Sequence, residues 1–147
     1  MSGSIIAGST LCVLGKFEPR RMLERIDAIK ANVFVGVPTM FVYLNREAGP
    51  GEGQSLERAI TGGAPMPLEV MREFEQKFQA QVIELYGLTE CAGVVTYNPM
   101  YYTAKPGSVG LAIPPLQVKI VDAEGGSGEL DAGQIGALCV RGPVVMK

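Results

Sequence analysis

The chain has 147 residues and combines a high apolar content with a charge close to neutral. Its 13 lysines and arginines face 15 acidic residues, so the formal net charge is −2 and the basic surface that nucleic-acid binding needs is missing. The chain contains no histidine. This excludes Ser-His-Asp and Cys-His catalysis, as well as metal sites with histidine ligands.

The cysteines and the apolar runs indicate a cellular compartment. Cys12, Cys91 and Cys139 lie far apart and form no C-x-x-C pair, which argues against a disulfide framework and favours a reducing, cytoplasmic location. The longest apolar runs, such as residues 33–37, are much shorter than the ~18 residues that a membrane span needs. No signal peptide is visible, so we expect neither secretion nor a membrane span.

The first part of the chain predicts a strand, a helix and a second strand. Residues 10–14 form a short apolar run that is typical of a buried strand. Pro19 suits the first turn of a helix, and apolar residues follow it at helical spacing: Met22, Leu23, Ile26 and Ile29. Residues 33–37 are β-rich and are followed by Pro38, which indicates the second strand. This order is the signature of a parallel sheet in an α/β fold.

A second unit of the same kind follows. Residues 40–44 predict a short helix, and residues 59–61 predict a brief strand. Pro67 begins a helix with apolar residues at three- and four-residue steps: Val70, Met71, Phe74 and Phe78. Residues 82–85 form the next strand, and residues 86–90 lie at its carboxyl end, where open α/β sheets bind their ligands.

The pattern changes from residue 105 onward. Residues 118–120 alternate between apolar and polar, as in a half-buried strand, and residues 137–140 predict a second strand antiparallel to the first. We therefore divide the chain into an α/β unit, residues 1–104, and the start of a small β unit, residues 105–147. Strand edges left exposed in such a piece predict self-association, as in a homo-oligomer.

Two segments carry possible chemistry. Residues 61–65, Thr-Gly-Gly-Ala-Pro, run from a strand into a backbone with few side chains, against which a flat ligand could lie. The alternative is a tight turn between strand and helix. Residues 86–90, Tyr-Gly-Leu-Thr-Glu, offer an aromatic face for a purine, a hydroxyl for a phosphate and a carboxylate for Mg²⁺. Here the alternative is that Tyr86 covers the core and Glu90 faces water.

The two segments in this order resemble the adenylate-forming superfamily, which includes acyl-CoA synthetases, peptide-synthetase adenylation domains and firefly-type luciferases. The resemblance covers nearly the whole chain. Further matching stretches are residues 37–39 (Val-Pro-Thr), 107–110 (Gly-Ser-Val-Gly), 118–122 (Val-Lys-Ile-Val-Asp), 133–136 (Gly-Gln-Ile-Gly) and 140–143 (Val-Arg-Gly-Pro).

The resemblance implies a reaction and a set of site residues. In that family a carboxylate attacks the α-phosphate of ATP, which gives an acyl-adenylate and pyrophosphate, and the thiol of coenzyme A then displaces AMP. By resemblance, Thr89 and Glu90 are catalytic, and Glu90 binds Mg²⁺. ATP or AMP contacts Gly63, Ala64, Pro65, Tyr86, Gly87 and Thr89. The acyl group lies near Gly87, Leu88, Cys91, Ala92 and Gly93.

The resemblance also implies an incomplete enzyme. A phosphate-binding loop, a ribose-binding aspartate and a mobile C-terminal domain are expected outside this chain, so we interpret it as an internal fragment that is inactive alone. Residues 141–146 (Arg-Gly-Pro-Val-Val-Met) resemble fatty acyl-CoA ligases most, and small side chains near residue 87 leave room for a long acyl chain. The alternative is a non-enzymatic α/β scaffold that binds a partner through its exposed edges.

Overall fold

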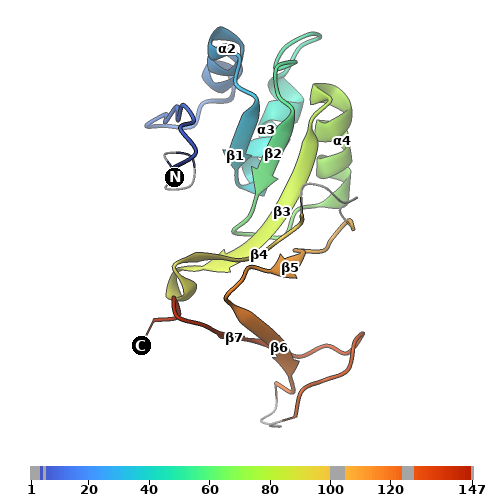
Figure 1. Ribbon diagram of the computed structural model, residues 1–147. Helices are drawn as coiled ribbons and strands as arrows, with labels where there is room; N and C mark the ends of the chain where they lie inside the picture. The colour runs from blue at the N-terminus through green and yellow to red at the C-terminus, as the bar shows by residue number, and fades with distance from the viewer. Residues whose placement is uncertain (1–3, 5, 100–104, 124–127, 147) are drawn as a thin grey trace.

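The computed structural model describes residues 4, 6–99, 105–123 and 128–146, and these form an α/β layer followed by a small β-sheet (Figure 1). One sheet has the order β1-β2-β3-β4-β5, and a separate two-stranded sheet pairs β6 with β7. The strands are β1 (Val33–Gly36), β2 (Arg58–Thr61), β3 (Gln81–Leu88), β4 (Gly93–Tyr97), β5 (Leu111–Ala112), β6 (Gln117–Val121) and β7 (Ala137–Arg141). The helices are α2 (Pro19–Ile29), α3 (Pro38–Glu47), α4 (Leu68–Phe78) and the 3₁₀ turn η1 (Thr89–Cys91).

The sheet changes direction halfway across. β1, β2 and β3 are parallel, whereas β4 and β5 are antiparallel to their neighbours, as are β6 and β7. The predicted fold class, a parallel α/β layer followed by a small antiparallel unit, is therefore confirmed. The predicted boundary after residue 104 stays a prediction, and we note that β5 lies beyond it and pairs with β4.

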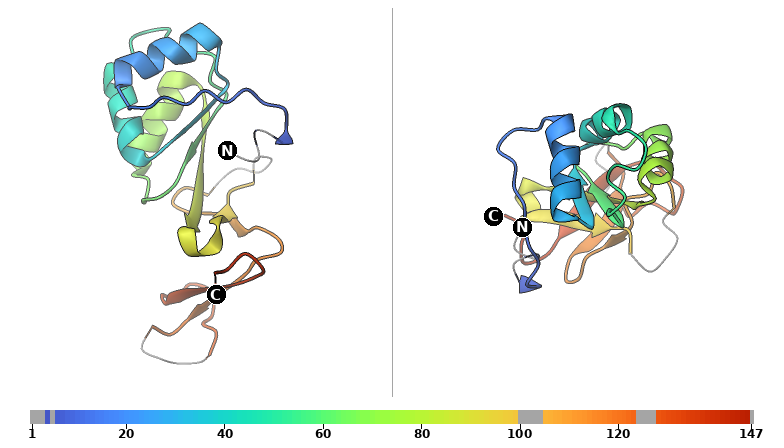
Figure 2. Two further views of the ribbon diagram at one scale, coloured as in Figure 1. Left: turned by 90° about the vertical axis from the view of Figure 1, so that its left-hand side faces the viewer. Right: turned by 90° about the horizontal axis from the view of Figure 1, so that it is seen from above.

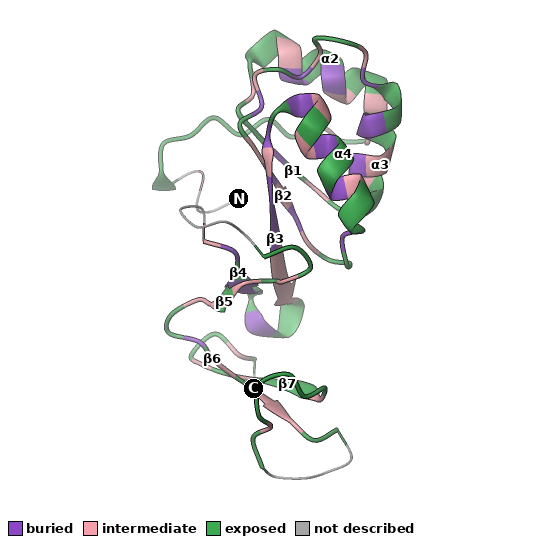
Figure 3. Ribbon diagram, turned by 90° about the vertical axis from the view of Figure 1, so that its right-hand side faces the viewer, coloured by how far each residue is buried: buried purple, intermediate pink, exposed green. Residues whose placement is uncertain are grey.

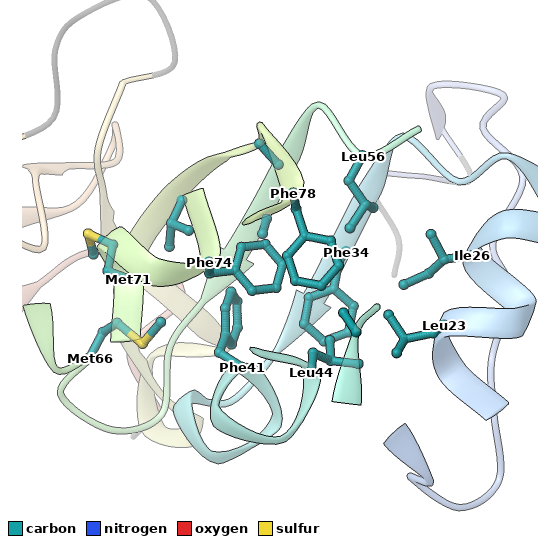
Figure 4. Close-up of a cluster of buried hydrophobic side chains, with 14 residues drawn as sticks. Leu23, Ile26, Phe34, Phe41, Leu44, Leu56, Met66, Met71, Phe74 and Phe78 are labelled. Carbon is teal, nitrogen blue, oxygen red and sulfur yellow. The ribbon is translucent and has the colours of Figure 1, made fainter. Parts of the chain in front are cut away.

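Helices α2, α3 and α4 lie on one face of the parallel strands (Figure 2). Four phenylalanine rings meet in the core between these helices and the sheet, with centroids 4.3–5.2 Å apart between successive rings: Phe34, Phe41, Phe74 and Phe78 (Figure 4). Phe34 comes from β1, and the other three rings come from α3 and α4. The helical spacing seen in the sequence thus places aromatic side chains from three elements in one cluster.

One predicted strand is wrong. Residues 10–14 have no regular structure, and Leu11 and Val13 are 43% and 68% exposed. An apolar run becomes a strand only where a neighbouring strand accepts its hydrogen bonds, and within the described residues β1 pairs with β2 alone. The sequence pattern contains no information about whether such a neighbour exists.

β3 is longer than predicted and carries the chain out of the helical layer. It was expected to end at residue 85, but it continues through Tyr86 and Gly87 to Leu88 and turns back through η1 into β4. The small sheet then packs against this turn through Leu116, Val118 and Val140, and the Met146 N–H donates a hydrogen bond to the Glu90 carbonyl at 2.8 Å. Figure 3 shows that buried residues concentrate under the helices, while β6 and β7 remain intermediate or exposed.

Two further expectations concern cysteines and membranes. Cys12, Cys91 and Cys139 are all free thiols, and only Cys91 is buried. In the described part of the chain, each helix is too short or too polar to cross a bilayer.

Candidate functional site

The carboxyl ends of the three parallel strands meet at one edge of the sheet, and residues 62–65 cross that edge. Gly62 and Gly63 have contacts that favour glycine. A Cβ on Gly62 would lie 2.6 Å from Leu85 Cδ1, and Gly63 has a φ of +83°. A Cβ on Gly63 would lie 3.8 Å from Val37 Cγ1, so this segment runs beside the end of β1. Gly63, Ala64 and Pro65 are exposed, which leaves their backbone open to a ligand.

The turn between β3 and β4 brings two backbones into contact. A Cβ on Gly87 would lie 2.0 Å from the Gly93 carbonyl oxygen, so only glycine fits there without movement of the backbone. The strand register shifts between Tyr86 and Gly87, and Ala92 and Gly93 both have positive φ angles, 56° and 115°. These features form a tight, bulged hairpin that presents Thr89 and Glu90 to solvent.

A cavity of about 480 Å³ lies between these two segments. Its lining combines residues from both motifs: Gly63, Leu85, Gly87, Leu88, Thr89, Ala92, Gly93 and Val94. Six of these were predicted site residues, although residue 63 is more than 20 positions away from the others. Leu85 and Val94 were missed. Leu85 directly precedes residues 86–90, and this position is the signal that could have found it.

The remaining predicted residues lie beside the cavity rather than in its lining. Tyr86 is half-buried and packs on the apolar cluster that contains Cys91, Val95 and Leu116. Cys91 is 3% exposed and thus lies beneath the turn. Ala64, Pro65 and Glu90 are exposed and follow the lining residues Gly63 and Thr89 along the chain, at the rim of the cavity. The adenine-stacking role of Tyr86 and the acyl-contact role of Cys91 stay predictions.

Thr89 and Glu90 are the donors available for a divalent cation at this rim. Glu90 is exposed and makes no ion pair with the described residues, so its carboxylate is uncommitted. No group of three or more His, Cys, Asp or Glu that could hold a metal occurs within the described ranges. One carboxylate and one hydroxyl fit Mg²⁺, because this ion keeps several waters and takes further ligands from substrate phosphates.

The perturbed ionisable groups lie away from this edge. The Arg20 guanidinium donates two hydrogen bonds to the Glu52 carboxylate, one of them at 3.1 Å, and the Gly49 N–H donates a third at 2.7 Å. The Arg20 bonds, followed by the Gly49 bond, hold the pKa of Glu52 below its ordinary value of 4.5. Arg20 lies in the first turn of α2, and Gly49 and Glu52 lie in the loop that leads from α3 into the amino end of β2, so we interpret the pair as structural.

A second cavity of about 880 Å³ lies between residues 9–14 and the α2–β1 region. It is larger than the first, but none of the predicted site residues lines it. Its walls include residues 10–12 and 14, from the segment that was expected to be a strand. We therefore place the candidate site at the smaller cavity, where both motifs meet.

Known proteins resemble this chain over its whole length. A family model described as "AMP-binding enzyme" matches residues 1–147. The chain is 35% identical over 150 residues to a long-chain-fatty-acid–CoA ligase of Bacillus subtilis, covering 100% of this chain and 26% of that protein. It is 32% identical over 143 residues to the Escherichia coli O157:H7 protein of the same name, covering 96% and 25%.

Solved structures agree with the sequence comparisons. ATP-bound MatB from Rhodopseudomonas palustris superposes with a TM-score of 0.89 at 32% identity, covering 99% of this chain and 29% of that one. The chain thus spans about a quarter of the length of the curated relatives it matches. Because the family model matches every residue, the chain belongs to the family of AMP-binding enzymes.

Proposed function

We propose that this chain carries the nucleotide and acyl site of an ATP-dependent acyl-CoA ligase that activates a fatty acid as acyl-AMP and transfers it to coenzyme A. The observation that carries the proposal is the cavity in which Gly63 meets Gly87, Thr89 and Gly93. It joins the two segments that the resemblance assigns to adenylate and acyl binding. The names of the relatives support the choice of reaction and of acid.

In the first step, the formation of acyl-AMP from the acid and ATP, each residue at this edge has a separate role. The open backbone of residues 63–65 accepts the adenine, against which Tyr86 stacks from β3. The Thr89 hydroxyl donates to an α-phosphate oxygen while the substrate carboxylate attacks phosphorus and pyrophosphate leaves. Glu90 would hold Mg²⁺, which when bound neutralises charge on the phosphate oxygens.

In the second step the coenzyme A thiol attacks the acyl carbonyl carbon, and AMP leaves with the electrons of the broken acyl–phosphate bond. Cys91 is not the thiol nucleophile, because it is 3% exposed and lies outside the cavity lining. It supports the wall instead. A cytoplasmic location belongs to the same proposal and rests on the three free thiols.

The cavity walls favour an apolar acyl group. Leu85, Leu88 and Val94 supply branched aliphatic side chains, and Gly87 and Ala92 leave space between them. Thr89 adds a hydroxyl to these apolar side chains, so it can bind the polar end of a substrate. We therefore propose a fatty acid rather than a charged or strongly polar acid.

A second candidate is a non-enzymatic scaffold, and one observation favours it. The face of β1 opposite the helices is uncovered, with Val33 41% and Val35 67% exposed. Parallel sheets are normally covered on both faces. This apolar face could bind a second copy of the chain, so a homo-oligomer is part of this candidate.

A hybrid enzyme tests the proposed function. Residues 1–147 replace the matching stretch of the Bacillus subtilis ligase, and fatty-acid-dependent exchange between pyrophosphate and ATP is measured. We expect activity in the hybrid and a loss of about 100-fold in Glu90→Gln, while Glu129→Gln, an exposed carboxylate of the small β unit, keeps it. A folded hybrid without exchange, or one indifferent to Glu90→Gln, contradicts the proposal.

A further inference from the structure

A buried carboxylate that the proposed reaction does not use lies beneath residues 62–65. Glu84 belongs to β3, two residues before Tyr86, and is 7% exposed. It shares a face of the strand with Val82, the face that the helices cover. Burial of a carboxylate is unfavourable unless hydrogen bonds compensate for lost water. The hydrogen bonds of Glu84 should therefore show which segment this buried carboxylate holds in place.

The Glu84 side chain holds one end of the crossing segment. Its Oε1 accepts a hydrogen bond from the backbone N–H of Met66 at 3.3 Å. Met66 is buried and directly follows the three exposed residues 63–65. At the other end of the segment, Gly62 packs closely over Leu85. The segment is thus fixed to β3 at both ends, and the carboxylate supplies one of these attachments.

Asn98 ties the same strand to a third segment. It is 5% exposed, and its backbone N–H and its Nδ2 both donate to the Glu84 carbonyl, at 3.3 and 3.2 Å. Nδ2 also donates to the Ser108 carbonyl. Thr96, which lies opposite Tyr86 in the strand register, donates to the Val109 carbonyl at 2.8 Å. Buried and half-buried hydrogen bonds therefore connect residues 62–66, β3 and the turn at 107–110.

We infer that Glu84 and Asn98 are positioning residues of the nucleotide site. The hydrogen bonds of their side chains with the Met66 N–H, the Glu84 carbonyl and the Ser108 carbonyl, which we call the brace, hold the site in place from β3. The inference rests on the proposed function, since it assumes that the adenylate lies against residues 63–65. Neither side chain needs to contact the ligand, because both act through backbone groups. Buried polar contacts of this kind rigidify their surroundings, and here they keep the open backbone of residues 63–65 at a fixed place above β3.

Thr61 provides a matched control. It is 1% exposed, lies beside Glu84 in the register of β2 and β3, and its hydroxyl has no hydrogen-bond partner among the residues described. Thr61→Val keeps the shape of the side chain and removes only this unpaired hydroxyl. The change leaves every bond of the brace in place, so it separates the brace from burial in general.

The test uses the 147-residue chain with dodecanoyl-sulfamoyl-adenosine, a non-hydrolysable acyl-adenylate analogue, and Mg²⁺. Calorimetry gives the dissociation constant, and hydrogen exchange reports on the Met66 amide. We expect Glu84→Ala to weaken binding about tenfold and to speed exchange at Met66 by a similar factor, which is the effect of losing one hydrogen bond. Glu84→Gln keeps an acceptor oxygen and should stay within about twofold on both measurements, as should Thr61→Val.

The outcomes separate this inference from the proposed function. A folded Glu84→Ala chain with native affinity and native exchange overturns the brace, and so does Glu84→Gln behaving like Glu84→Ala. If Glu84→Ala does not fold, Asn98→Ala carries the same test, with weaker binding expected and native binding contradicting. A folded native chain that does not bind the analogue contradicts the proposed function instead. Faster exchange at Met66 in Glu84→Ala than in the native chain then shows whether the hydrogen bond between Glu84 and Met66 exists.

Discussion

Close contact between backbones at the β3–β4 turn makes Gly87 a residue that no other can replace. Its missing Cβ would meet main-chain atoms of Gly93 and Val94 at 2.0–2.9 Å, and main-chain atoms cannot rotate away as a flexible side chain can. Gly87 and Gly93, which make this contact, both line the cavity. The shape of the site therefore depends on one hydrogen atom in place of a methyl group.

Gly87→Ala is expected to lower the free energy of unfolding by about 3 kcal/mol, because the added methyl overpacks the hairpin. Urea unfolding followed by circular dichroism measures the change. Gly15→Ala is the control, since a Cβ at Gly15 meets nothing within 4 Å, and it should cost less than about 0.5 kcal/mol. Equal effects of the two substitutions would contradict the contact.

The Arg20–Glu52 pair predicts a pH-dependent contribution to stability. Because hydrogen bonds lower the pKa of Glu52 in the folded state below 4.5, the pair stabilises the fold fully above that pH. The contribution disappears as the pH falls through the lowered pKa. Glu52→Gln should therefore be less stable than the native chain at pH 7, and the difference should shrink as the pH falls below the ordinary carboxyl pKa of 4.5. A difference in urea midpoint that is constant with pH would argue against the pair.

Among the elements, the helices and the parallel strands were predictable because their patterns are local. Proline at the first turn and apolar residues at helical spacing place α2 and α4 to within a few residues. β1, β2 and the two strands of the small sheet were likewise found. By contrast, α3 is longer than expected, and β4 and β5 were not predicted, since a short strand in a hairpin depends on its partner more than on its own residues.

The same distinction explains the site. The motifs identified six residues of the cavity lining, but not Leu85 or Val94, because an aliphatic residue in a strand is usually core. Tyr86 was expected after the strand, whereas β3 extends through it and its ring packs on the cluster of Cys91, Val95 and Leu116. Buried polar contacts such as Glu84 with Met66 depend on how β3 lies against the segment between β2 and α4, so sequence patterns alone cannot reveal them.

The end of α2 permits a test of backbone strain in one element. Lys30 ends the helix with φ 51° and ψ 49°, a left-handed conformation that side chains with a Cβ disfavour. Lys30→Gly should raise the free energy of unfolding by about 0.5–1 kcal/mol, measured by urea denaturation. Lys30→Ala removes the same charge but keeps the strain, so it should give no such gain. A gain in both variants would assign the effect to charge.

At the level of the whole molecule, the helices cover one face of the sheet and leave the other open. Figure 2 shows α2, α3 and α4 side by side on the covered face. On the open face of β1, Val35 is 67% exposed. An exposed apolar strand at a sheet edge is prone to pair with another chain.

We expect the 15.6 kDa chain to associate with itself as its concentration rises, and Val35→Lys to reduce that association. Sedimentation velocity over a range of concentrations measures it. Gln76→Lys adds the same charge on the exposed side of α4 and should leave association unchanged. A native chain that stays monomeric, or two variants that behave alike, would show that the open face is not the contact.

An NMR titration of the chain with dodecanoyl-sulfamoyl-adenosine and Mg²⁺ tests the central claim, the location of the site, most directly. The account predicts the largest amide shifts at Gly63, Gly87, Thr89 and Gly93, around the cavity of about 480 Å³. Residues around the larger cavity, such as Cys12 and Lys30, should not shift. Shifts at the larger cavity, or no shifts in a folded sample, would contradict the claim that these two motifs form an acyl-adenylate site.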